Sequence, residues 1–138
     1  MRARLCDTVS AITAMSVIEL PKKVRQRAVR PPGLPEGECA WSQTDALDVL
    51  KTFEGSLVAL FRVDIYVVPL GQHEVIPTGR RATYSYNPGE LAIEFAQRSR
   101  HEAEDFIGAG SDDELYVLSL SGQDDAEAGH GTVRLRAG

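Results

Sequence analysis

The segment from Leu57 to Val68 constrains the fold more than any other part of the sequence. Its odd-numbered positions are all apolar, whereas its even-numbered positions are mixed and include Arg62 and Asp64. Alternation with a period of two is typical of a β-strand that packs one face on a core. The pattern therefore predicts a central strand over 57–68, with Arg62 and Asp64 on an exposed face.

A helix is predicted over about 42–54. Ser42 is a favourable N-cap, and Asp45 stands three residues later, as in a capping box. The apolar residues that follow recur at helical spacing, and Gly55 provides a stop. Trp41 directly precedes this helix, and we expect it to anchor the core there.

A second, longer helix is predicted over about 88–107. Asn87 is a suitable N-cap, Pro88 fits the first helical position, and Glu90 stands at the third. One stripe of this segment is apolar, and the opposite face carries His101, Glu102 and Asp105 among other polar residues. The pattern is that of an amphipathic helix whose charged face meets solvent.

The remaining segments indicate an α+β fold, in which a small, mainly antiparallel sheet of three to five strands packs against the two main helices. A short helix over 21–29 and further strands over 74–76, 81–86 and 115–120 complete the pattern, with Pro77 and Gly79 ending the strand at 74–76. We expect residues 1–18 to form an N-terminal extension, with Met15 as an alternative start. Residues 19–121 form a single domain, and 122–138 form a flexible acidic, Gly-rich tail with an edge strand at 132–136.

Length and composition narrow the class of protein. The 138 residues suffice for one domain with its own core. No run of 18 apolar residues is present, so we expect no membrane partner and a cytoplasmic location. The two cysteines, Cys6 and Cys39, form neither a disulfide framework nor a metal-binding spacing.

Charge is divided unevenly along the chain. Residues 1–30 hold seven Lys or Arg against two carboxylates, whereas residues 31–138 hold eight against eighteen. An acidic body disfavours nucleic acid as a partner and favours association with a basic protein. The alternative is that the carboxylates serve only solubility.

No set of residues predicts catalysis. His101 and Asp105 lie one turn apart, but zinc helices of metalloproteases carry two histidines at that spacing. The glycines at 108 and 110 follow a helix rather than a strand, unlike a dinucleotide-binding loop. We therefore expect no enzyme, no metal and no cofactor.

Several short runs resemble the immunity protein 40 family. The resemblance spans about 19–120 and rests on Glu19-Leu20-Pro21, Ala40-Trp41-Ser42, Asp45-Ala46-Leu47, LFRVDIY at 60–66, Gly89-Glu90, Arg98-Ser99 and Tyr116-Val117-Leu118. Members of this family are small cytoplasmic proteins of bacterial polymorphic toxin systems. The resemblance implies stoichiometric neutralisation of a cognate toxin domain encoded by an adjacent gene, without catalytic residues.

The acidic character suggests which residues contact such a partner. The first candidates are Asp112, Asp113 and Glu114, followed by Glu102 and Asp105, and then Asp64 with Tyr66. A nuclease is one toxin class that fits, because its nucleic-acid groove is basic. The alternative function is a regulatory or adaptor protein that binds a non-toxin protein. The sequence leaves the toxin's activity and the oligomeric state open.

Overall fold

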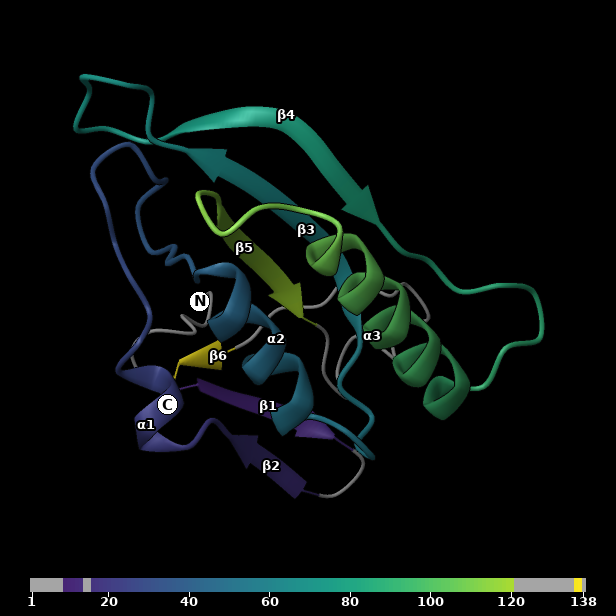
Figure 1. The fold of residues 1–138 in the computed structure, drawn as a ribbon. Helices are drawn as coiled ribbons and strands as arrows, with labels where there is room; N and C mark the ends of the chain where they lie inside the picture. The colour runs from purple at the N-terminus through teal and green to yellow at the C-terminus, as the bar shows by residue number, and fades with distance from the viewer. Residues whose placement is uncertain (1–8, 14–15, 121–135, 138) are drawn as a thin grey trace.

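The structure is a computed structural model that describes residues 9–13, 16–120 and 136–137 (Figure 1). It confirms the α+β class. The elements in chain order are β1 (Val9–Thr13), β2 (Ser16–Glu19), α1 (Lys22–Arg25), α2 (Gln43–Thr52), β3 (Leu60–Val67), β4 (Ile76–Thr83), α3 (Ala92–Gly108), β5 (Leu115–Leu120) and β6 (Arg136–Ala137).

Two antiparallel sheets are formed among the described residues. The main sheet has the order β4-β3-β5, and the smaller one has the order β2-β1-β6. Trp41 and Tyr116 exchange backbone hydrogen bonds of 2.9 and 2.8 Å, which extend the main sheet beyond β5. The predicted strand over 115–120 is confirmed.

The core lies between the main sheet and the two long helices, which cover the same face of that sheet (Figure 1). Trp41 is fully buried there, as predicted, and its neighbours in the core include Phe53, Ile65, Ile107 and Tyr116. The predicted cap of α2 is also present, because the backbone N–H of Asp45 donates to Ser42 Oγ at 3.2 Å. Helix α1 is shorter than the predicted 21–29.

The central strand begins at Leu60 rather than at Leu57. Side chains of α3 hold the chain that precedes β3: Arg100 donates to the carbonyls of Ser56 and Val58, and Ser99 Oγ accepts from the N–H of Leu60. This backbone is therefore engaged by a helix instead of a neighbouring strand. Apolar residues that alternate with a period of two do not distinguish backbone bonded to a helix from backbone paired with a strand.

Strand β4 continues through Pro77 and Gly79, where the sequence predicted a break. It is an edge strand of the main sheet, so the missing N–H of Pro77 leaves the ladder intact. The register shifts between Asp64 and Tyr66 of β3, and Gly79 absorbs the irregularity with a φ of 86°. One bulged strand thus replaces the two predicted at 74–76 and 81–86.

Helix α3 begins at Ala92, four residues after the predicted start. Asn87 is not its N-cap: the N–H of Glu90 donates to the Asn87 carbonyl at 3.0 Å, and Gly89 has a φ of 77°. These residues form a turn. The acid that caps the helix is Glu94, whose Oε1 accepts from the N–H of Leu91 at 2.8 Å.

The predictions for the two ends of the chain lie largely outside the described residues. These are Met15, Cys6 and the tail, including 132–135 of the expected edge strand. Residues 9–13 and 16–18 of the expected extension lie in strands β1 and β2, and residue 136 begins β6.

Candidate protein-interaction surface

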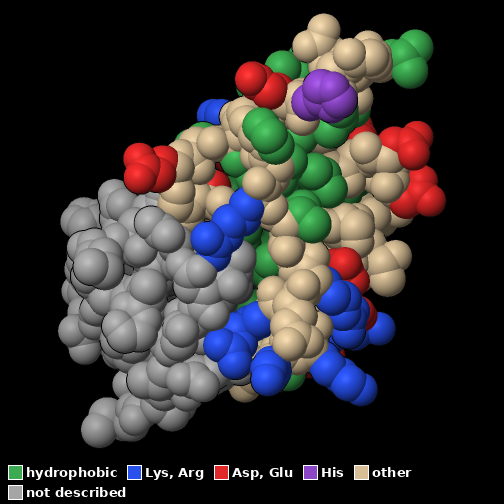
Figure 2. Space-filling view, turned by 90° about the vertical axis from the view of Figure 1, so that its left-hand side faces the viewer, with side chains coloured by type: hydrophobic (Ala, Val, Ile, Leu, Met, Phe, Trp, Pro, Cys, Tyr) green, Lys and Arg blue, Asp and Glu red, His purple; other side chains and the backbone are tan. Residues whose placement is uncertain are grey.

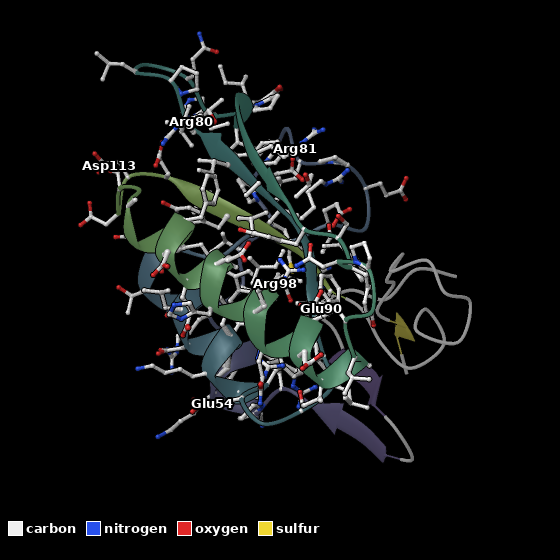
Figure 3. The ribbon with its side chains drawn as sticks, turned by 90° about the vertical axis from the view of Figure 1, so that its right-hand side faces the viewer. Glu54, Arg80, Arg81, Glu90, Arg98 and Asp113 are labelled. Carbon is white, nitrogen blue, oxygen red and sulfur yellow. The ribbon has the colours of Figure 1, made fainter. Side chains whose placement is uncertain are left out.

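The C-terminal half of α3 and the turn that follows it carry five carboxylates, which we call the acidic face: Glu102, Glu104, Asp105, Asp112 and Asp113. All are exposed except Glu104, which is half-buried. Asp113 lies beyond the C-terminal end of α3, away from Glu90 and Arg98 (Figure 3). The structure thus places four of the predicted contact residues on one end of one helix.

These carboxylates stand where a helix favours the opposite charge. The C-terminal end of a helix carries a partial negative charge, so cations are stabilising there and anions are not. The last turn of α3 contains no basic residue but does contain Asp105, which Glu104 directly precedes. The helix dipole therefore does not account for the acids at this end.

Few cations neutralise the acidic face. Arg98 Nη1 lies 3.2 Å from Glu102 Oε2, and His101 Nε2 lies 3.7 Å from Asp105 Oδ2. Within residues 20–120, no Lys, Arg or His forms an ion pair with Glu104, Asp112 or Asp113. Most of the negative charge on this surface is therefore not paired within residues 20–120.

The negative field extends to Tyr84. Burial raises the pKa of its phenol to about 12, and the charges of Glu102 and Asp105 add to that rise. Tyr84 Oη is buried and has no hydrogen-bond partner within residues 20–120. The phenol therefore stays neutral beneath the acidic face across the physiological range.

Glu114 was predicted to contact a partner together with Asp112 and Asp113, but unlike them it is buried. It is 8% exposed and forms an ion pair with Arg80 of β4. Its Oε1 accepts from the N–H of Ser111 at 3.1 Å, and it lies 3.4 Å from Tyr116 Oη. Glu114 thus anchors the turn to the sheet rather than presenting charge to a partner.

Asp64 and Tyr66 lie on β3, away from the acidic face. Val63 and Ile65 point into the core beneath the helices, so alternation turns Asp64 to the opposite face of the sheet. The prediction of an exposed Asp64 is wrong: it is 9% exposed, with ion pairs of 2.8 Å to Arg62 and 2.6 Å to Arg81. Arg62 lies two residues before Asp64 on the same face of β3, and the antiparallel register places Arg81 of β4 opposite Asp64. Tyr66 is half-buried.

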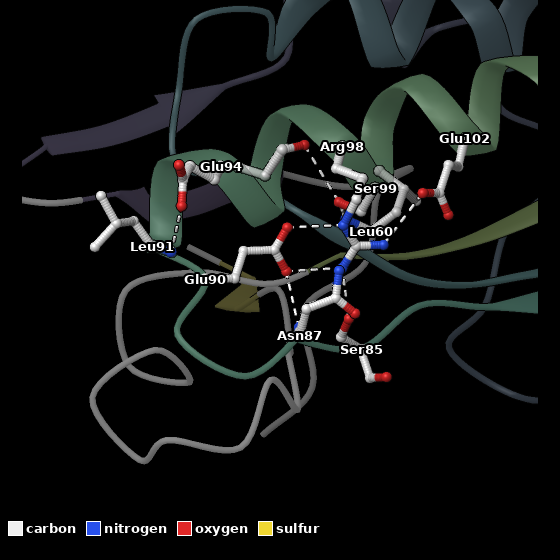
Figure 4. Close-up of polar contacts among 10 residues, drawn as sticks. Leu60, Ser85, Asn87, Glu90, Leu91, Glu94, Arg98, Ser99 and Glu102 are labelled. Atoms are coloured by element: carbon white, nitrogen blue, oxygen red, sulfur yellow. Dashed lines mark hydrogen bonds and ion pairs between the residues drawn. The ribbon is translucent and has the colours of Figure 1, made fainter.

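Arg98 joins α3 to the loop before it (Figure 4). Its Nε and Nη2 donate to the two carboxylate oxygens of Glu90 at 2.7 and 2.8 Å, and Nη2 also donates to the Ser85 carbonyl at 2.6 Å. The two bonds from Arg98, and a third from the backbone N–H of Asn87 at 2.9 Å, lower the pKa of Glu90 to about 2. The guanidinium also lies over the ring of Phe95. This cluster fixes the loop in place.

Sequence patterns did not single out Arg100, which is 5% exposed although it lies on a charged helix. It borders an open pocket of about 520 Å³ between α2 and α3, together with Glu54, Gln97, His101 and Glu104. Burial lowers the pKa of the guanidinium, and the charges of Glu54 and Glu104 oppose that shift. The four α3 residues recur at i, i+3, i+4 and i+7, which is the spacing of one helix face.

Basic side chains gather elsewhere. Figure 2 shows Lys and Arg in the lower half of the side that carries α1, where Lys22, Lys23 and Arg25 form that helix's basic turn. Arg27 follows, and its Nη1 lies 3.0 Å from Asp45 and 2.6 Å from Asp48 of α2. The basic turn of α1 thus lies apart from the C-terminal end of α3 (Figure 1).

None of the family models, curated proteins or solved structures that were compared with the chain matches it. The described residues contain no group of three or more His, Cys, Asp or Glu side chains placed to hold a metal ion. No helix in that part of the chain has the length and apolar character needed to cross a membrane.

Proposed function

We propose that this chain is an immunity protein, which binds a cognate toxin domain stoichiometrically and neutralises it. The observation that carries the proposal is the acidic face, where exposed carboxylates crowd the end of α3 that favours cations. Carboxylates at this end of the helix are explained if a basic partner neutralises them in a complex. The sequence resemblance to immunity proteins supplies the class of partner.

The chemistry of the surface agrees with a basic toxin groove. A nuclease needs Lys and Arg to hold phosphates, and carboxylates on a protein can occupy those positions in place of the phosphates. Complementary charge also accelerates encounter, which suits an antidote that must act before its toxin does. A stable complex of this kind buries about 1,600 Å² in total, so side chains beyond the five carboxylates take part.

The rigid scaffold supports this role. The acidic face is built on a helix and on a turn that Glu114 ties to β4 and β5. Surfaces that are already ordered lose little conformational freedom on binding. The partner would therefore meet the carboxylates close to their positions in the free protein.

Co-expression tests the proposal. The C-terminal domain encoded by the adjacent upstream open reading frame is expressed in a susceptible host, with and without this chain, and surviving colonies are counted. We expect the domain to kill alone and the chain to restore growth. A lethal domain against which the chain gives no protection would contradict the proposal and favour an adaptor that binds a non-toxin protein.

A further inference from the structure

We infer that the pocket between α2 and α3 receives a basic side chain of the partner, an arginine or lysine held between Glu54 and Glu104. This inference rests on the proposed function, because the partner is the toxin domain. The pocket is continuous with the acidic face, since Glu104 belongs to both.

The floor of the pocket has unused hydrogen-bond donors. Arg100 donates to the carbonyls of Ser56 and Val58 at 2.9 and 2.6 Å, and both bonds start from Nη1. Its Nη2 and Nε donate to no described residue, and neither is among the fully buried polar atoms of that part of the chain, so both donors face the open pocket. A guanidinium has five N–H donors in a fixed plane, so its remaining donors require an acceptor from water or from a ligand.

The rim of the pocket supplies the opposite chemistry. Glu54 lies beyond the end of α2, below α3 in Figure 3, and Glu104 lies on α3. Neither carboxylate forms an ion pair with any described residue. Two carboxylates against one guanidinium leave the pocket negative, which disfavours an anionic ligand.

A basic residue within a peptide chain satisfies both parts of the pocket. Its cationic head lies between the two carboxylates, and a backbone carbonyl beside it accepts from Arg100. The open volume of about 520 Å³ admits a long side chain together with the backbone that carries it. Because charge pairs at an interface gain strength when both partners are desolvated, this contact would slow dissociation.

The experiment compares two double variants with the same change in net charge. E54Q/E104Q removes the carboxylates of the pocket, and E36Q/E74Q removes two exposed ones elsewhere. Arg100 is left intact because it holds the backbone at 56–58. With the toxin domain of the adjacent gene, we expect E54Q/E104Q to raise Kd by about 10-fold, mainly through faster dissociation, and E36Q/E74Q to leave it nearly unchanged. Equal affinities of the two variants would overturn the inference and leave the proposed function standing.

A second measurement does not need the toxin. The full chain is titrated with Nα-acetyl-L-arginine amide, and its neutral isostere Nα-acetyl-L-citrulline amide serves as control, while amide and guanidinium NMR signals are followed. We expect the arginine compound alone to shift signals of Gly55, Gln97, Arg100 and Glu104, and the shifts to vanish in E54Q/E104Q. Absence of shifts at these residues, or shifts that persist in that variant, would overturn the inference even if the toxin does not bind.

Discussion

Glu90 and Arg98 are joined by two parallel hydrogen bonds, from Nε to Oε2 at 2.7 Å and from Nη2 to Oε1 at 2.8 Å (Figure 4). Such bidentate pairs are the strongest form of Arg–carboxylate contact. Glu90 belongs to a turn outside the helix, and Arg98 lies in the second turn of α3. The pair thus attaches the 84–91 loop to the helix that carries the acidic face.

The first prediction concerns acid stability. Because Arg98 lowers the pKa of Glu90 from 4.5 to about 2, the pair stabilises the fold above pH 4.5, and this contribution is lost as the pH falls toward 2. Glu90→Gln should lower Tm at pH 7 and weaken the fall of Tm between pH 4.5 and 2. Thermal unfolding followed by circular dichroism measures both effects. An unchanged pH dependence in this variant would show that the pair does not stabilise the fold.

The second prediction concerns Ser99, which is buried in α3. Its Oγ accepts from the N–H of Leu60 at 3.0 Å and donates to the Ala96 carbonyl at 3.2 Å. Ser99→Ala leaves the Leu60 N–H buried without a partner, which should reduce the free energy of unfolding by about 1–3 kcal/mol. Ser85→Ala is the matched control, because Arg98 contacts only the Ser85 carbonyl. Urea denaturation of both variants measures the difference, and equal losses would contradict the assignment.

The third prediction separates stability from binding. Asp105→Asn removes negative charge from the last turn of α3, so it should increase the free energy of unfolding by about 0.3–1 kcal/mol. The same change should weaken binding of the toxin domain. Glu94→Gln should instead destabilise the protein, because it removes a negative charge from the first turn, where a helix favours anions. Denaturation curves together with Kd values test this, and reduced stability of Asp105→Asn would contradict it.

The fourth prediction concerns the rate of association. Asp112→Lys with Asp113→Lys reverses charge on the turn without touching Glu114, which holds that turn to β4. We expect association with the toxin domain to slow by about 10-fold at low salt and the difference to shrink at high salt. Glu36→Lys with Glu74→Lys provides the same change in net charge away from the acidic face. Stopped-flow rates that are equal for the two double variants would remove the turn from the interface.

Local patterns in the sequence predicted much of the fold. The Ser42 cap, the burial of Trp41 and the strand over 115–120 depend on neighbouring residues or on simple periodicity, and all are confirmed. The start of α3 was misplaced because Asn87 and Glu90 stand at capping positions but form a turn instead.

The candidate site was predictable only in part. Exposure of Asp112 and Asp113 follows from local polarity, whereas burial of Asp64 and Glu114 depends on Arg81 and Arg80, which the register of β4 brings beside them. The burial of Arg100 likewise depends on carbonyls more than 40 positions away in the chain. Contacts at such separation leave no trace in the spacing of residues.

Hydrogen exchange of the chain with and without the toxin domain of the adjacent gene tests the central claim most directly. We expect slower exchange in the complex over residues 101–113, with little change on the face of β3 and β4 that carries Arg62 and Arg81. Protection confined to that sheet face, or absent from α3 and the turn, would contradict the claim that the acidic face binds the toxin.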